Sequence, residues 1–507
     1  MAASAGQSEE QERASPATPP DAEKSKGGSD DGAPSRLCDD VTRNILARLP
    51  ARTAVACTAL SKHHRRLIRS PEFRSLHFRL APPLPRPHIA CVATAPIRRR
   101  PDQEEDPTSG FVGFHVAGGG GLSGVTPMRS LVGRRYINVE YVNACNGVVL
   151  LATEEYTEPR GRRRRCILWN PAVADVVEEV AIPDPPTRSD DYLTLGLGYG
   201  QRSKTYKLLL CRIDVSARGH RAVKSLATFA LGGMEKEKQL TELPVGLGQD
   251  DASFSQNSLY VDGRVYVLDR ENLAILAFDV DDETVTSIDL PIEVGPRDLW
   301  NHTPSLMELH GRPCVATDYD GGVTLWSLSV DHQLDQWCVV WEVCSDNSYV
   351  GSVKGVWDCG GVMVVNLENK CYGGVDFLFL YDVTTEETFK ATLDRDLAPE
   401  WTESCANPKL CWGYRPTLVS PSSIVGKLDQ DKDTFSRDIM KALRPVAEQD
   451  KRRGLEETLD VMCFVDFLVR LMQKLPEDLQ QVVEMKLMDS NSPDISFERV
   501  IFEDEDV

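Results

Sequence analysis

A pattern that recurs about every 50 residues constrains the fold of this chain more than any other feature. Between Tyr141 and about Val419, short β-rich runs alternate with glycine-containing and acidic turns. Three turn glycines, Gly263, Gly311 and Gly360, follow one another at intervals of 48 and 49 residues. An apolar run lies on each side of every one of these glycines, so about four strands fit into one repeat. Repeats of this length are typical of β-propeller blades of the kelch kind.

Further repeats extend this pattern in both directions. Earlier units are visible at residues 143–171 and 195–231, which brings the number of recognisable units to five. A sixth unit would combine the stretch 85–135 with strands near residues 416–420. We therefore predict an all-β, kelch-like propeller over residues 141–421, with a β-sandwich as the alternative fold.

A compact helical pattern precedes the repeats. Four apolar residues follow one another at a spacing of four, which places them on one helical face: Leu37, Val41, Ile45 and Leu49. Asp39 and Asp40 lie where the first turn of a helix favours negative charge. Pro50 ends this helix, because its ring clashes with the preceding turn. Ser70 and Pro71 close a second helical stretch, since the residue before a proline avoids the helical region.

This helical segment, residues 36–80, resembles an F-box. The residues that match the family pattern are Asp39, Asp40, Val41, Ile45, Leu46, Arg48, Leu49, Pro50, Leu60, Ser61, Lys62, Arg65, Leu67, Ile68, Ser70, Pro71 and Phe73. The resemblance implies three packed helices that dock on the Skp adaptor of a cullin–RING ubiquitin ligase. It also implies the docking residues, some of which must form the core of the module itself: Leu37, Val41, Ile45, Leu46, Leu49, Pro50, Leu60, Leu67 and Ile68. Cys38, Thr42 and His64 depart from the pattern.

The β-rich region carries a second resemblance. Its motifs, in order, begin at Asn143 (Asn-Ala-Cys-Asn-Gly), Leu168 (Leu-Trp-Asn-Pro), Leu197 (Leu-Gly-Tyr-Gly) and Trp412 (Trp-Gly-Tyr-Arg-Pro-Thr-Leu-Val-Ser-Pro). In this order, after an F-box, they are similar to the F-box-associated region of plant F-box proteins, in particular of grass members. The two resemblances together cover roughly residues 36–421.

The remaining segments differ in composition. Residues 1–35 are rich in Ser, Pro, Ala, Gly and acids, so we predict disorder, because too little apolar surface is present to offset the entropy of ordering. Residues 81–140 read as a linker that can contain strands. Residues 427–507 return to a helical apolar stripe and form a predicted helical, acidic tail. This tail fits either a helical pair packed on the β domain or a helix that binds a partner or a second copy.

Charge is unevenly distributed along a chain whose net charge is -20. Ten basic residues against three acidic ones give residues 36–80 a net charge of +7, whereas twelve basic against twenty acidic residues give residues 427–507 a net charge of -8. The overall negative charge argues against non-specific binding of nucleic acid. A basic F-box suits an acidic protein partner, although a solvated basic face would look the same.

Catalytic and metal-binding patterns are not found. The 14 cysteines contain no Cys-x-x-Cys pair, His88 and Cys91 have no second ligand pair nearby, and the acidic residues cluster in turns such as the one at Asp281. The run of arginines at residues 162–165 reads as a loop, either a solvated basic one or a patch for nuclear import or an acidic ligand. We predict no enzyme activity of the chain itself, no cofactor, no metal and no membrane span.

We therefore predict a substrate-recruiting adaptor of an SCF-type ubiquitin ligase, with the Skp adaptor and, through it, a cullin as partners and an unknown protein as substrate. The absence of an export signal and of cysteine pairs predicts a cytoplasmic or nuclear location. Two alternatives remain open at this point. One is a scaffold or binding protein with a degenerate F-box, which Cys38, Thr42 and His64 motivate. The other is a propeller enzyme or a glycan-binding module.

Overall fold

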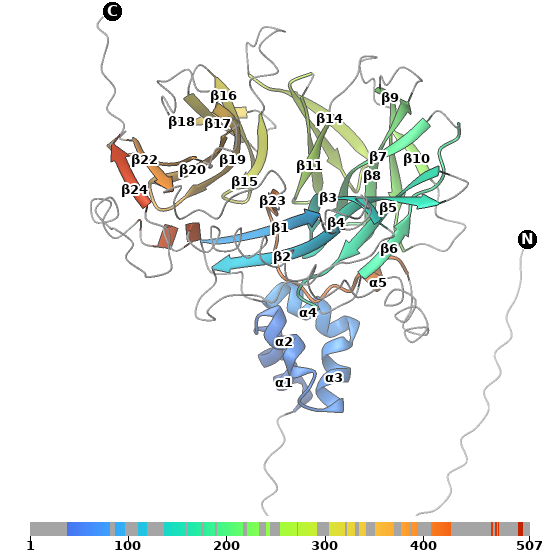
Figure 1. Cartoon of the computed structure of the whole chain (residues 1–507). Helices are drawn as coiled ribbons and strands as arrows, with labels where there is room; N and C mark the ends of the chain where they lie inside the picture. The colour runs from blue at the N-terminus through green and yellow to red at the C-terminus, as the bar shows by residue number, and fades with distance from the viewer. Residues whose placement is uncertain are drawn as a thin grey trace, which may run out of the picture. The chain divides into compact units, whose positions relative to one another are not determined.

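The structure is a computed structural model that describes most of the predicted F-box and of the repeat region (Figure 1). The described residues are 38–81, 87–96, 110–118, 136–157, 161–173, 177–187, 190–215, 221–232, 240–243, 254–270, 272–291, 304–319, 322–329, 334–340, 350–369, 377–385, 388–393, 407–426, 468–469, 472–473, 475 and 495–499. The chain divides into two units, Met1–Thr42 and Arg43–Val507. The predicted disordered segment 1–35 lies outside the described residues.

Four short helices come first: α1 (Asp39–Ala47), α2 (Ala51–Cys57), α3 (Lys62–Arg69) and α4 (Pro71–Leu80). The three helices expected of an F-box are α1 to α3, and α4 follows them directly. Serine side chains begin the last two helices, because Ser61 Oγ accepts from His64 N (3.1 Å) and Ser70 Oγ accepts from Phe73 N (3.2 Å). The prolines act as the sequence predicts, since α1 ends before Pro50 and α3 ends before Pro71.

The repeat region folds into the blades of a six-bladed β-propeller, each an antiparallel sheet (Figure 1). Five of the six sheets are built on four strands that are consecutive in the sequence: β3 (Tyr136–Cys145), β4 (Val148–Thr157), β5 (Gly161–Trp169) and β6 (Val177–Ala181); β7 (Asp190–Tyr199), β8 (Tyr206–Val215), β9 (Arg221–Ala230) and β10 (Leu240–Leu243); β11 (Phe254–Val261), β12 (Arg264–Asp269), β13 (Ala274–Asp279) and β14 (Thr284–Asp289); β15 (Ser305–Leu309), β16 (Arg312–Tyr319), β17 (Gly322–Leu328) and β18 (Leu334–Val340); β19 (Val350–Asp358), β20 (Val362–Asn369), β21 (Phe377–Asp382) and β22 (Thr388–Leu393), the last four being joined by one later strand.

Tight turns between the first two strands of a blade explain the spacing of the glycines. In three blades the turn consists of two residues that both have positive φ, and the second is glycine: Asn146–Gly147, Asp262–Gly263 and His310–Gly311. Such turns match the twist of the flanking strands and need glycine or asparagine-like residues. In the β19–β20 turn, Gly360 (φ 79°) and Gly361 (φ 104°) take the same role. The interval of 48 or 49 residues between the turn glycines is therefore the distance along the chain from this hairpin in one blade to the same hairpin in the next.

The sixth sheet closes the ring with strands from two distant parts of the chain. Its order is β2 (Gly110–Gly118), β1 (His88–Pro96) and β23 (Asn407–Leu410). The stretch predicted as a linker thus supplies two blade strands. The partner strand from the C-terminal side is β23, and the predicted strands near residues 416–420 are instead an irregular segment followed by the short helix α5 (Pro421–Ile424).

Two further sequence predictions are corrected by the strands. The arginine run at 162–165 lies in β5, and Arg163 and Arg164 stand opposite Glu155 and Glu154 of β4. Because the run lies in a strand, it is not the loop expected from the sequence. In the predicted helical tail, the described residues 468–469 and 472–473 are helical, as predicted, but β24 (Ile495–Arg499) is a strand that lies beside β22 as a fifth strand of that sheet. Most of the tail lies outside the described residues.

Apolar clusters between neighbouring sheets form the core of the propeller. One cluster joins Leu150 and Leu168 of one blade to Leu197 and Leu208 of the next, all fully buried. The first strands of these blades, β3 and β7, also pack against β11. Because both faces of a sheet are covered, strands such as β20 are apolar without alternation.

Candidate functional site

In the structure, the predicted docking residues of the helical region fall into an exposed set and a buried set. Val41, Ile45 and Leu60 are 43%, 51% and 68% exposed, and Pro50 is exposed too. The buried set is brought together in one cluster that forms the core of the helices, against which Leu49 packs half-buried: Leu46, Leu67 and Ile68. Leu37 lies outside the described residues. The structure thus shows which of the predicted residues can reach a partner and which support the module.

Phe78 is an exposed apolar residue that sequence reasoning missed. It lies in α4 and is 54% exposed, whereas Phe73 and His77 of the same helix are buried. Phe73 and His77 are four positions apart and share one face, and Phe78 lies off that face. A helical projection of residues 71–80 would have revealed this phenylalanine.

Most of the exposed large apolar side chains belong to the helical region. Among the described residues, four of the five lie there, Val41, Ile45 and Phe78 in helices and Leu60 in the turn between α2 and α3, and the fifth is Val383 in the propeller. Burying such side chains against a partner is favourable by about 25 cal/mol per Å². The helical region is therefore the described part of the chain best suited to bind another protein through apolar contacts.

Helix α3 adds positive charge to this region. Four basic side chains on it are exposed, and the helix contains no acidic residue: Lys62, Arg65, Arg66 and Arg69. His64, which replaces an aromatic residue of the family pattern, accepts or donates a hydrogen bond with Ser61 Oγ through Nδ1 (2.7 Å). A partner with an acidic surface would be attracted to α3 before contact.

His77 is a buried polar group within the helical core. Its Nε2 lies 3.0 Å from the Leu49 carbonyl oxygen, which it can reach as a donor, and its Nδ1 has no hydrogen-bond partner. Burial lowers the pKa of His77, and the hydrogen bond to Leu49 opposes that shift. The neutral imidazole therefore joins α4 to the end of α1.

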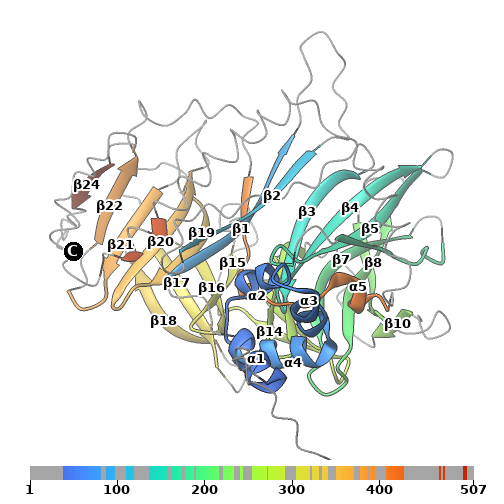
Figure 2. The same cartoon turned by 90° about the horizontal axis from the view of Figure 1, so that it is seen from below.

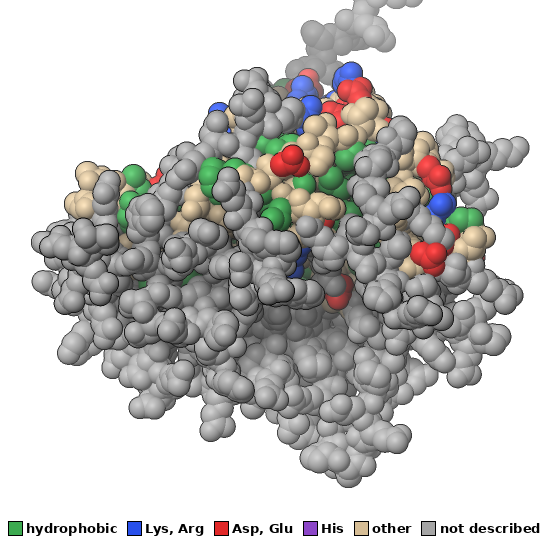
Figure 3. Space-filling model, turned by 90° about the horizontal axis from the view of Figure 1, so that it is seen from above, with side chains coloured by type: hydrophobic (Ala, Val, Ile, Leu, Met, Phe, Trp, Pro, Cys, Tyr) green, Lys and Arg blue, Asp and Glu red, His purple; other side chains and the backbone are tan. Residues whose placement is uncertain are grey.

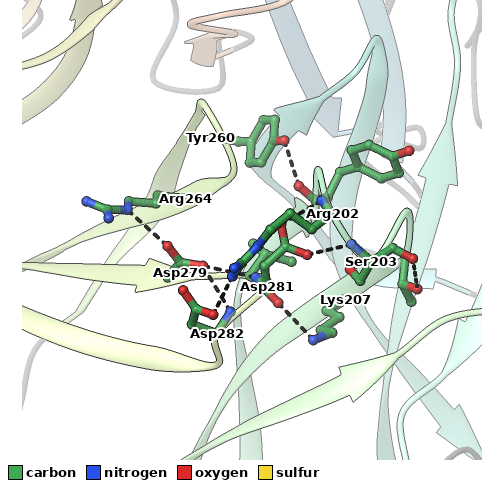
Figure 4. A network of polar contacts seen from close by, with 11 residues as sticks. Arg202, Ser203, Lys207, Tyr260, Arg264, Asp279, Asp281 and Asp282 are labelled. Carbon is green, nitrogen blue, oxygen red and sulfur yellow. Dashed lines mark hydrogen bonds and ion pairs between the residues drawn. The ribbon is translucent and has the colours of Figure 1, made fainter.

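A polar network joins two propeller blades at the turns β7–β8 and β13–β14 (Figure 4). Asp281 accepts hydrogen bonds from the backbone N–H groups of Arg202 and Ser203, both at 2.8 Å. Lys207 Nζ donates to Val280 O (2.8 Å) and to Glu283 (2.7 Å).

These contacts explain the electrostatics of the network. Burial raises the pKa of Asp281, but the hydrogen bonds from Arg202 and Ser203, together with the Arg202 guanidinium, outweigh it and lower the pKa to about 2. The carboxylates are thus occupied by partners within the protein, and the network has the character of a clamp between blades. The acidic turn residues serve structure, as the sequence suggests.

Metal and membrane chemistry receive no support from the described residues. No group of three or more His, Cys, Asp or Glu side chains among them could hold a metal ion. His88 and Cys91 lie three positions apart on strand β1, so their side chains point to opposite faces of the sheet. The described part of the chain has no helix long and apolar enough to cross a membrane.

Comparison with known families decides the classification. The F-box domain family matches residues 34–76, and the family described as F-box associated beta propeller domain matches residues 129–406, more than half of the chain. This chain belongs to the F-box associated beta propeller family. The F-box match covers α1 to α3 and the first part of α4, and the propeller match covers the five blades built on consecutive strands. Strands β1, β2 and β23 of the closing blade lie outside the propeller match. No curated protein matches this F-box protein.

Similar solved structures are distant. Prolyl oligopeptidase B from Galerina marginata is 9% identical, with a TM-score of 0.31 over 62% of this chain and 44% of that enzyme, so the chain spans less than half of the enzyme's length. A protein of unknown function from Bacteroides caccae is 11% identical, with a TM-score of 0.30 over 60% of this chain and 91% of that one. The nidogen/laminin complex contains a chain that is 9% identical, with a TM-score of 0.32 over 59% and 91%.

Proposed function

We propose that this F-box protein is a substrate-recruiting adaptor of an SCF-type ubiquitin ligase. The F-box would bind a Skp adaptor and, through it, a cullin, and the propeller would bind a protein substrate. Catalysis would belong to the partner enzymes, and this chain would act by holding the substrate near the charged ubiquitin carrier. The observation that carries the proposal is that the segment matching the F-box family carries the exposed apolar side chains of Ile45 and Leu60, and that Phe78 is exposed two residues beyond that match.

The propeller is the part left to recognise a substrate. On the face drawn in Figure 3, the described side chains include hydrophobic, acidic and basic ones. Loops at the ends of blade strands vary readily without disturbing the sheets, which is why such surfaces carry specificity. A cytoplasmic or nuclear location belongs to the same proposal, since ubiquitin ligases of this type act there.

A pull-down with a plant Skp adaptor tests the proposal. We expect the full chain to form a stable one-to-one complex on size-exclusion chromatography. The double variant Ile45→Asp/Leu60→Asp should weaken binding by about 100-fold or more, because two carboxylates would be buried against an apolar partner. Phe78→Ser should weaken binding by about tenfold.

A matched control is available in the propeller. Val383→Asp changes an equally exposed apolar residue (49% exposed) outside the F-box, and it should leave adaptor binding unchanged. A folded wild-type chain that does not bind the adaptor would contradict the proposal and favour a scaffold with a degenerate F-box. Equal loss of binding in Val383→Asp and in the double variant would show that the effect is not specific to the F-box.

A further inference from the structure

The chain that follows β23 connects several blades. We call residues 411–426 the strap. The ring of Trp412 lies 5.7 Å from the ring of Trp357 in β19, and the ring of Tyr414 lies 4.7 Å from that of Phe114 in β2. At its far end, α5 lies against β6 (Figure 1; α5 is also labelled in Figure 2). The strap is therefore fixed to the propeller along its whole length.

One residue of the strap and one of the propeller complete the core of the F-box. Leu418 and Ala172 are 4% and 6% exposed, and both belong to the same buried cluster as Phe73 of α4. The fully buried side chains that helix α2 contributes to this cluster are the small ones of Ala51 and Ala54, while Val55 and Cys57 pack against it half-buried. Because these alanines leave room that a bulkier helix would fill, Leu418 supplies apolar volume that the F-box sequence lacks.

The buried side chain of Asn170 holds both of these residues in place. Its Nδ2 donates to Thr417 O (3.0 Å) and to Val419 O (2.7 Å), the carbonyl groups on either side of Leu418. Its Oδ1 accepts from Ala172 N (2.9 Å). Asn170 is fully buried, so removal of its side chain leaves three buried backbone groups without this partner.

A second contact fixes the strap just before Leu418. Thr417 Oγ1 donates to Asn146 O (2.6 Å) in the β3–β4 turn. Gly147 in the same turn has φ of 76°, and a Cβ there would lie 2.5 Å from Arg415 O. Only glycine allows the strap to approach the turn this closely.

An electrostatic interaction also links the F-box to the strap. Burial raises the pKa of Tyr414 in the strap, and the guanidinium of Arg52 in α2 opposes that shift. An arginine of the F-box is thus close enough to the strap to act on its tyrosine.

We propose that Asn170 is a positioning residue which, through Leu418 and Ala172, makes the folded state of the F-box depend on the propeller. The strap would complete the F-box core, and adaptor binding would require an intact strap. The last step rests on the proposed function, whereas the dependence of the F-box fold on the strap does not.

Hydrogen exchange on the full chain without any adaptor tests the first step. We expect Leu418→Ala to speed the exchange of amides in α2 to α4 by tenfold or more, while amides of β11 to β14 keep their protection. Asn170→Ala should have the same effect. If Leu418→Ala does not give folded protein, Leu418→Val removes less volume and should show a smaller increase in the same amides. Unchanged exchange in α2 to α4 in both Leu418 variants would overturn the proposal.

Two controls separate the proposal from general loss of stability. Ile424→Ala removes a buried side chain from the same strap, but one that packs between propeller blades. Asn143→Ala removes another fully buried asparagine, which bonds to Leu197 of the neighbouring blade. Both should speed exchange in propeller strands and leave α2 to α4 protected; faster exchange in these helices as well would overturn the proposal.

Adaptor titration then tests the second step. A wild-type chain that binds the adaptor and a Leu418→Ala variant that binds at least tenfold more weakly would support it. Equal affinity of the two would overturn the dependence of docking on the strap. A wild-type chain that does not bind would contradict the proposed function, and the exchange result would still decide whether the strap completes the F-box.

Discussion

The F-box and the propeller differ in how far their large apolar side chains are exposed. Ile45, Leu60 and Phe78 in the helical region are more than half exposed, whereas large propeller side chains such as Trp169 and Phe278 are fully buried. A short helical module cannot cover all of its apolar surface by itself, but stacked blades cover both faces of each sheet. The difference indicates that apolar residues serve stability in the propeller and can serve binding in the F-box.

The largest expected contrast is between one buried and one exposed leucine. Leu150→Ala in the propeller should lower the free energy of unfolding by about 3 kcal/mol, because a cavity remains in a fully buried cluster. Leu60→Ala in the F-box should change it by no more than about 0.5 kcal/mol. Urea denaturation followed by circular dichroism measures both. A comparable loss in Leu60→Ala would remove the distinction between the two regions.

The hydrogen bonds between two blades should contribute nearly as much to stability as a leucine of the apolar core. Asn143 Nδ2 donates a hydrogen bond to Leu197 O (2.9 Å), and Asn143 Oδ1 accepts one from Leu197 N (3.0 Å). Asn143→Ala should cost about 2 kcal/mol, because both backbone groups of Leu197 stay buried without a partner. The exposed Gln201 offers a control, and Gln201→Ala should leave the urea midpoint unchanged. A midpoint for Asn143→Ala equal to that of the wild type would show that water replaces the amide.

The acid sensitivity of the propeller should depend on the Asp281 clamp. Because the pKa of Asp281 is lowered to about 2 in the folded state, its contribution is present above about pH 4, near the ordinary pKa of aspartate, and is lost as the pH falls toward 2. Asp281→Asn should therefore reduce the stability at pH 7 by about 1 kcal/mol and flatten the profile between pH 5 and 2, given the partial hydration of the site. Parallel thermal denaturation profiles of the two proteins would contradict this assignment.

The F-box should respond to mild acid through His77. Burial lowers the pKa of this histidine in the folded state, so the unfolded chain binds the proton more readily. The stability that the neutral imidazole provides is thus full above the ordinary histidine pKa and is lost as the pH falls below it. In His77→Gln, whose amide can still donate to Leu49 O, hydrogen exchange in α2 to α4 should vary less between pH 7.5 and 5.5, after correction for the intrinsic rate. A pH response as large as that of the wild type would exclude His77 as its source.

Local patterns made much of the fold predictable. The helix starts at Ser61 and Ser70 and the helix ends before Pro50 and Pro71 depend on neighbouring residues alone. The blade period was visible because hairpin turns need glycine, as at Gly263, where φ is positive. The candidate site was predicted only in part, since a spacing of four residues places side chains on a common face without showing whether that face is covered.

Contacts between distant residues set the limits of that prediction. The sequence suggested a loop at the arginine run 162–165, because the order of residues does not show that these arginines stand opposite the acidic residues of β4. Leu46 and Ile45 are neighbours in the sequence, yet one is buried and the other is half exposed. Sequence spacing could not separate these two roles.

The sequence by itself determined the F-box helices, the propeller repeat and the order of the two, because caps, prolines and turn glycines act over a few residues. Only the tertiary structure decided how the ring closes, with β1 pairing with β23 from more than 300 residues away, and which residues complete the F-box core. Asn170 reaches Thr417 across 247 positions, and such a contact depends on the path of the whole chain between them. Side-chain chemistry makes that bond favourable, but folding brings its two ends together.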